Sequence, residues 1–66
     1  MTVQLNGVPT EVDPGATLAD VLDAHGVPER GVAVAVAGEV VPRAAWGSTP
    51  LRDGVVLEVL TAVQGG

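Results

Sequence analysis

The sequence predicts an α+β fold in which a mixed sheet of four to five strands wraps around one helix. Fourteen valines and six leucines, with no Phe, Tyr or Ile, favour strands and an aliphatic core. Turn signals divide the chain into short apolar segments, and a single segment has helical spacing. With 66 residues and no cysteine, the chain is expected to form one domain, residues 1–66, without disulfides.

The first twelve residues predict a hairpin, because Asn6-Gly7 is a favoured two-residue turn with both central residues at positive φ. Pairing Leu5 with Val8 fixes the register. The apolar residues that then share the core face are Met1, Val3, Leu5, Val8 and Val12. Pro9 has no N–H to donate, so the second strand is expected at a sheet edge.

The segment DPGATLADVLDAHGV predicts the helix. Thr17 can cap its first turn together with Asp20, and Gly26 is the expected stop. The residues at spacing i, i+3 and i+4, which should lie on the sheet, are Leu18, Val21 and Leu22.

Three strands are expected after the helix. The first covers residues 32–36, with valines on one side and alanines on the other, and the second covers 40–41 after a turn at Gly38. A helical turn is expected over residues 43–46. The last strand lies in VVLEVLTAV, after an Asp53-Gly54 turn, and is long enough to be central.

The last strand is expected to have one core face and one outer face. If Glu58 points away from the core, Leu57 and Val59 point inward, and Val56 and Leu60 lie outside with Glu58. Because one helix covers one face of a sheet, these three outer residues are a candidate partner surface. The alternative is that they are ordinary exposed side chains.

Charge and hydropathy exclude several classes of protein. The formal net charge is −5, with three arginines and no lysine, which disfavours nucleic-acid binding. The charge either favours a basic partner or keeps a small domain soluble. The apolar runs are too short to span a bilayer and MTVQLNG lacks the features of a secretory signal, so a soluble cytoplasmic protein is expected.

No internal residues predict an active site. His25 is expected at the end of the helix, Ser48 has no recognisable activating partner, and Asp20 and Asp23 are typical of a solvated face. A zinc ligand set cannot be assembled from one histidine and no cysteine. We therefore expect no catalytic residue, no metal and no bound cofactor, and so a protein that is not an enzyme.

The terminal Gly-Gly is the remaining candidate. A C-terminal carboxylate is an anion at neutral pH and can attack the α-phosphate of a nucleotide. Gly65 and Gly66 carry no side chains that would obstruct a narrow channel, and they accept the dihedrals that the channel imposes. We expect residues 62–66 to form a mobile tail in which Val63, Gln64 and Gly65 enter a partner's active site and Gly66 is modified.

Four segments of the chain resemble the ThiS family, the sulfur carriers of thiamine biosynthesis, which have a ubiquitin-like β-grasp fold. These segments are VAVAGEVVPRAAW, the LRDG turn, VVLEVLTAV and the terminal QGG. The resemblance covers essentially the whole chain. A terminal Gly-Gly is shared with ubiquitin and the molybdopterin carrier, whereas Val41-Pro42-Arg43 followed by Trp46 favours the thiamine branch. From the residues alone, structural roles are favoured: Pro42 ends a strand and Trp46 closes an edge of the core.

The resemblance implies that a ThiF-like adenylating enzyme uses ATP and magnesium to convert the Gly66 carboxylate into an acyl adenylate. Sulfur derived from a persulfide, supplied by a donor such as a cysteine desulfurase system, would displace AMP. The resulting thiocarboxylate would pass its sulfur to a ThiG-like thiazole synthase, and the free carrier is expected to be a monomer. The alternatives are a sulfur carrier for another pathway, such as molybdopterin, and a non-covalent ubiquitin-like interaction module.

Two positions depart from the family pattern. Ala37 stands where the family often has Asn before the glycine, so a different turn geometry is expected at Gly38. Val55 stands where the family often has a second acidic residue after the Asp-Gly turn. A partner contact through that carboxylate is not expected in this chain.

Overall fold

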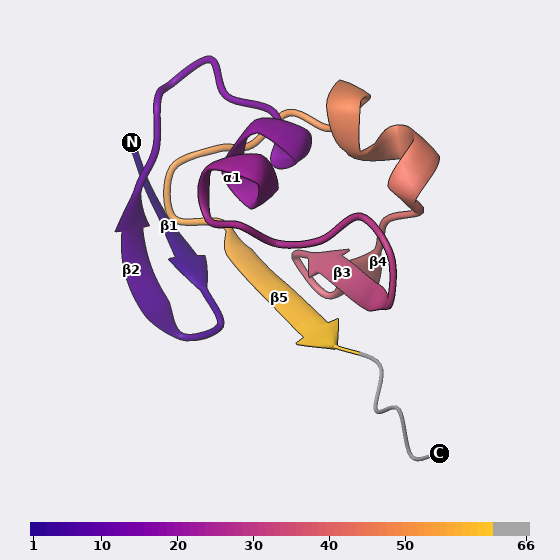
Figure 1. Ribbon diagram of the computed structural model, residues 1–66. Helices are drawn as coiled ribbons and strands as arrows, with labels where there is room; N and C mark the ends of the chain where they lie inside the picture. Colours follow the sequence, from indigo (N-terminus) through magenta and orange to yellow (C-terminus); the bar gives the residue numbers. More distant parts are fainter. Residues whose placement is uncertain (62–66) are drawn as a thin grey trace.

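A computed structural model describes residues 1–61, and across that range it shows a five-stranded sheet packed against an α-helix and a 3-10 helix (Figure 1). The elements are β1 (Thr2–Leu5), β2 (Val8–Glu11), α1 (Leu18–Ala24), β3 (Val32–Val36), β4 (Glu39–Val40), η1 (Arg43–Ser48) and β5 (Val56–Thr61). The strand order is β2-β1-β5-β3-β4, with β1 parallel to β5 and the other neighbours antiparallel. The predicted mixed sheet and the central last strand are confirmed.

The first hairpin has the predicted turn and register. Asn6 and Gly7 have φ values of 50° and 81°, and Leu5 pairs with Val8. This is the primed turn whose twist matches that of the two strands. β2 lies at the sheet edge, as Pro9 predicts.

The helix begins at the predicted cap. Thr17 Oγ1 accepts a hydrogen bond from the Asp20 N–H at 3.3 Å, and Asp20 Oδ2 accepts one from the Thr17 N–H at 2.9 Å. This reciprocal pair satisfies two donors that the first helical turn leaves free. His25 is the exposed C-cap residue, and the helix ends before Gly26 as expected.

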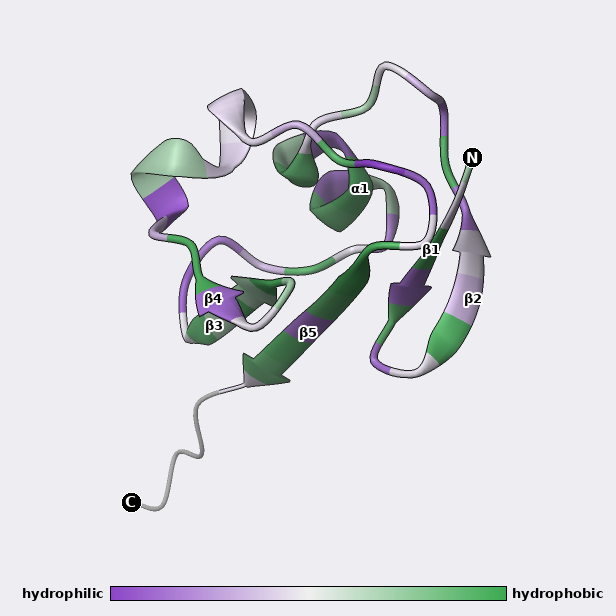
Figure 2. Ribbon diagram, turned by 180° about the vertical axis from the view of Figure 1, so that it is seen from behind, coloured by the Kyte–Doolittle hydropathy of each residue, from purple (hydrophilic) through white to green (hydrophobic). Residues whose placement is uncertain are grey.

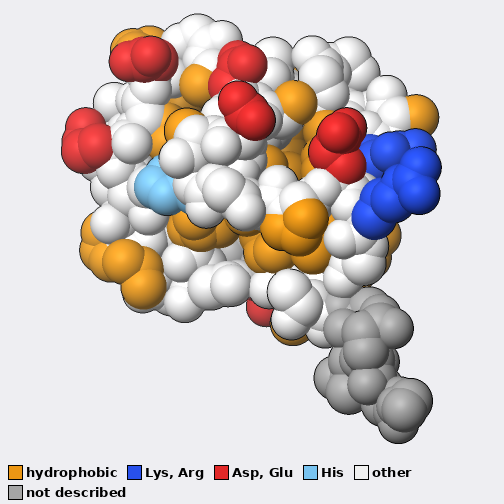
Figure 3. Space-filling model, in the orientation of Figure 1, with side chains coloured by type: hydrophobic (Ala, Val, Ile, Leu, Met, Phe, Trp, Pro, Cys, Tyr) orange, Lys and Arg blue, Asp and Glu red, His pale blue; other side chains and the backbone are white. Residues whose placement is uncertain are grey.

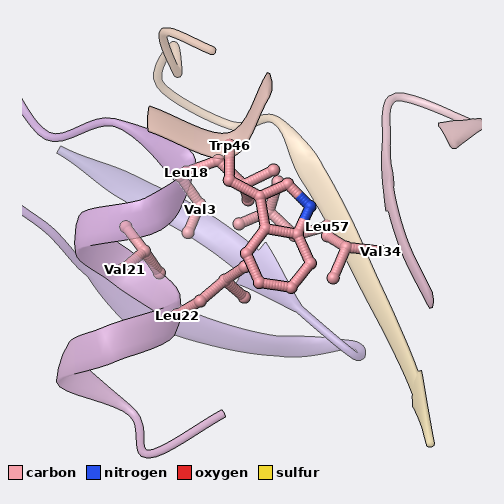
Figure 4. Packing of buried hydrophobic residues seen from close by; sticks show 7 residues of the cluster. All are labelled: Val3, Leu18, Val21, Leu22, Val34, Trp46 and Leu57. Carbon is pink, nitrogen blue, oxygen red and sulfur yellow. The ribbon is translucent and has the colours of Figure 1, made fainter. Parts of the chain in front are cut away.

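The core lies between the sheet and the two helices, where the indole of Trp46 packs beside residues from α1 and the strands (Figure 4). Trp46 is 6% exposed, and its Nε1 donates to the Val41 carbonyl at 3.0 Å, so its polar atom is satisfied. The buried residues are Val3, Leu18, Val21, Leu22, Val34, Trp46 and Leu57. Trp46 is thus a buried core residue, which agrees with its predicted structural role.

Val8 is on the predicted face but not in the core. It pairs with Leu5, yet it is 61% exposed. β2 is an edge strand, and the hairpin tip extends past the region of the sheet that α1 covers (Figure 1). The alternation of apolar and polar residues predicts which face of a strand points toward the core. It does not predict how far along that face the helix reaches.

The expectation for Ala37 was wrong. Ala37 and Gly38 have φ values of 52° and 85° and connect the paired residues Val36 and Glu39, so this is the same two-residue turn as Asn6-Gly7. The pairing of β3 with β4 leaves two residues for the connection and so requires positive φ at both. Ala37 accepts the left-handed conformation at a cost of about 1–2 kcal/mol.

Candidate functional site

β5 is the element that leads into the C-terminal segment. It lies between β1 and β3, and its pairing with β3 continues to Thr61, which stands opposite Val32. The predicted tail residues Val63, Gln64, Gly65 and Gly66 lie outside the described residues. The structure does show how the strand that precedes them is held.

The sheet surface opposite α1, called here the open face, carries the outer side chains of β5. Leu60 is 68% exposed and Val56 is 47% exposed, while Leu57 between them is fully buried on the other face. Glu58 is exposed and stands opposite Ala35 of β3. The predicted orientation of Val56, Glu58 and Leu60 is therefore confirmed, and their role as a partner surface stays a prediction.

The apolar surface of the open face continues from β5 to the sheet edge. Ala33 stands opposite Leu60, and Val40 of β4 stands opposite Ala35 and is 72% exposed. Small alanines on β3 thus separate larger apolar side chains on the two flanking strands.

Glu58 is the charged residue that β3, β4 and β5 present on the open face, because Glu39 pairs with inward-facing Val36. Figure 2 shows β5 as a hydrophobic strand interrupted by one hydrophilic band. Other acidic side chains are spread over the part of the surface near α1, and basic side chains gather at the edge beside η1 (Figure 3). Over β3, β4 and β5 the open face is therefore apolar with a central carboxylate, whereas β1 and β2 present polar residues such as Gln4 and Glu11 on it.

Two hollows flank α1, and neither brings a nucleophile to a base. The hollow between β2 and α1, of about 290 Å³, includes Glu11, Asp20 and His25 in its lining. The one between α1 and η1, of about 370 Å³, includes Asp23 and Trp46. Both present carboxylates and apolar side chains, with His25 in the first, and neither lining contains a hydroxyl, thiol or amine that a neighbouring base could activate.

The other internal candidates have structural contacts. Ser48 Oγ donates to the Ala45 carbonyl at 3.2 Å, and the Asp20 carboxylate accepts the cap hydrogen bond described above. In residues 1–61, no group of three or more His, Asp and Glu side chains could hold a metal ion. No helix in that range is long and apolar enough to cross a membrane.

Asn6 has a contact that its turn does not explain. Its Oδ1 accepts a hydrogen bond from the Val59 N–H at 2.7 Å, and its Nδ2 donates to the Val59 carbonyl at 3.1 Å. Sequence reasoning assigned only the turn to Asn6, because its partner lies 53 positions along the chain. A correct pairing of β1 beside β5 is the signal that places Asn6 next to Val59.

A mixed five-stranded sheet with one helix across it is the β-grasp arrangement, so residues 1–61 form a small ubiquitin-like domain. Residues 3–66 match the model of the ThiS family. The chain is similar to the sulfur carrier protein ThiS of Thermus thermophilus, with 44% identity over 64 residues, 97% of this chain and 98% of that protein.

Solved structures agree with the sequence comparisons. The crystal structure of the thiamine biosynthesis protein ThiS from Geobacter metallireducens has a TM-score of 0.83 and 33% identity, over all of both chains. A solution structure of a thiamine biosynthesis protein from the same organism has a TM-score of 0.78 and 33% identity, over all of this chain and 88% of that one. The chain belongs to the ThiS family. It is a sulfur carrier protein and not itself an enzyme.

Proposed function

We propose that sulfur is carried on the C-terminal carboxyl group of Gly66. A ThiF-like enzyme adenylates the carboxylate, and the thiocarboxylate formed from it supplies sulfur for the thiazole ring of thiamine. The observation that supports this best is the position of β5. The strand is paired with β1 at its start and with β3 as far as Thr61, five residues before Gly66. Five residues span at most about 17 Å, enough for Gly66 to enter an active site while the partner grips the domain.

The chemistry needs activation because a carboxylate is a poor electrophile. A carboxylate oxygen attacks the α-phosphorus of ATP, pyrophosphate leaves with its electron pair, and magnesium on the partner enzyme neutralises phosphate charge. The terminal sulfur of a persulfide then attacks the acyl carbon, and AMP leaves. A thiol cleaves the remaining S–S bond and supplies two electrons, which leaves a thiocarboxylate on Gly66 and a disulfide on the donor side.

The residues before Gly66 have a role in this proposal that follows from their size. Gly65 has no side chain to obstruct a channel to the adenylating centre, and Val63 and Gln64 would lie further out along the same channel. The carrier itself binds neither ATP nor magnesium, which belong to the adenylating enzyme. A donor such as a cysteine desulfurase system would supply the persulfide, and a ThiG-like thiazole synthase would receive the sulfur.

The open face supports the grip on the domain. Val56 and Leu60 present apolar side chains that α1 does not cover, and Glu58 lies between them in the strand. Docking there would bury apolar area and pair Glu58 with a cationic group on the partner. We expect the adenylating enzyme and the thiazole synthase to bind this face in turn, because both act on the same end of the chain.

Mass spectrometry tests the proposal. The chain is incubated with a ThiF-like enzyme, ATP, magnesium and a persulfide donor. The intact mass is expected to rise by the difference between sulfur and oxygen, with the change located at Gly66. A chain extended beyond Gly66 by an uncleaved tag is the control, and it should fold but remain unmodified. An unmodified wild-type C-terminal peptide, or full modification of the extended chain, would contradict the proposal.

Deleting Gly65 and Gly66 separates a carrier from a non-covalent interaction module. The shortened chain keeps the described domain, so a module would retain partner binding. If the protein is a carrier, the shortened chain should lose sulfur transfer completely. Consumption of the thiocarboxylate by thiazole synthase, compared with molybdopterin synthase, then tests the pathway directly.

A further inference from the structure

The hydrogen bonding of β1 to β5 continues beyond the point where β1 turns away. The Gln4 N–H donates to the Val55 carbonyl and the Asn6 N–H donates to the Leu57 carbonyl, both at 2.9 Å. The next residue of β5 with backbone groups on that side is Val59. At Asn6 the chain enters the hairpin turn, so no further backbone of β1 is there to pair with it.

The side chain of Asn6 takes the place of the missing strand residue. A carboxamide has one carbonyl and one N–H₂ group, the same acceptor and donor that a peptide unit offers. Both groups of the Asn6 side chain bond to the backbone of Val59: Oδ1 lies 2.7 Å from Val59 N, and Nδ2 lies 3.1 Å from Val59 O. The pairing of β5 on its β1 side is thereby extended to Val59, seven residues before Gly66.

We propose that Asn6 is a positioning residue for sulfur loading: its side chain holds the end of β5 and so sets where the C-terminal segment leaves the domain. This inference rests on the proposed function of Gly66. β3 holds the other side of the strand as far as Thr61. With β5 held on both sides as far as Val59 and by β3 as far as Thr61, the strand has lost conformational freedom before a partner binds, which lowers the ordering cost of binding.

Asparagine satisfies three requirements at once at this position. The turn needs a residue that tolerates positive φ, and Val59 needs both an acceptor and a donor at short reach. Glycine meets the first requirement but has no side chain. Aspartate tolerates the turn and accepts from the Val59 N–H, but as a carboxylate it has no proton for the Val59 carbonyl. These two residues therefore make informative substitutions.

The test combines amide exchange with adenylation kinetics in Asn6→Gly, Asn6→Asp and the full-length wild-type chain. For Asn6→Gly we expect exchange of the Val59 amide to become about 10-fold faster, because its acceptor is lost. We expect KM for the carrier in adenylation to rise about 3- to 10-fold, while kcat stays within about twofold, because the lost ordering affects binding and transition state alike. Asn6→Asp should raise KM similarly.

Thr17→Ala is the matched control for stability. It removes the helix cap, which lies away from β5, and should destabilise the domain by an amount similar to that caused by Asn6→Gly. If Thr17→Ala leaves KM unchanged while both Asn6 variants raise it, positioning is supported.

Three outcomes would overturn the inference: a wild-type KM in Asn6→Gly, unchanged exchange at Val59, or an equal rise of KM in Thr17→Ala. Failure of the wild-type chain to be adenylated at Gly66 would instead overturn the proposed function. The exchange at Val59 reports on the Asn6 contact in either case.

Discussion

Leu57 and Leu60 belong to the same strand and are the same residue type, but they lie in opposite environments. Leu57 is fully buried against the core, and Leu60 is 68% exposed on the open face. The three-residue offset places them on opposite faces of β5, and α1 covers only one of these. A single strand therefore supplies both core packing and exposed apolar surface.

This difference separates stability from recognition along one strand. In a domain this small, the inner face has to contribute much of the folding free energy. The outer face is free of that demand, so its apolar residues can serve a partner. Substitutions on the two faces should accordingly change different measurements.

The largest expected effect is on stability, from Leu57→Ala. Truncating a buried leucine removes apolar contacts and leaves a cavity, which costs about 2–5 kcal/mol of unfolding free energy. That is a large share of the total for a domain of this size. Leu60→Ala should change it by less than about 0.5 kcal/mol. Urea denaturation of both variants measures the two values, and equal losses would contradict the comparison.

Leu60→Ala should instead weaken partner binding. Loss of an anchor side chain in a docked interface typically costs about 1–2 kcal/mol, which corresponds to a rise in KM for adenylation of about 5- to 30-fold. Val8→Ala is a suitable control, because Val8 is 61% exposed but lies on the other face of the sheet at the hairpin tip. If both variants raise KM equally, exposed apolar area in general, and not the open face, would be responsible.

Glu58→Gln tests the charge in the centre of the open face and should have a smaller effect. The substitution keeps the shape and removes one carboxylate, so we expect KM to rise about 2- to 5-fold at low salt, with the difference shrinking as salt screens the interaction. Glu39→Gln is matched in charge but pairs with inward-facing Val36. A salt-independent effect at Glu58, or an equal effect at Glu39, would argue against pairing with a partner cation.

The two faces of β5 could be predicted from sequence because alternation is a local property of a strand. Glu58 fixed the orientation, and Leu57 followed from it. The exposure of Val8 could not be predicted in this way, because it depends on how far α1 reaches across the sheet. The contact between Asn6 and Val59 also depends on strand order, which joins residues 53 positions apart.

The conformation of Ala37 also depends on strand pairing, because the register of β3 with β4 imposes a positive φ that alanine disfavours. Relieving that strain should have the smallest effect of the series. Ala37→Gly keeps positive φ without the steric penalty, although glycine also gains freedom in the unfolded chain. We expect a net gain of about 0.5–1 kcal/mol in unfolding free energy. Because no side chain on either face of β5 is altered, the KM for adenylation should remain that of the wild type. This result would show that added stability alone does not improve recognition by the partner enzyme. Denaturation and adenylation measured on the same sample decide this, and a loss of stability would mean that the strain at Ala37 is smaller than the entropy cost of glycine.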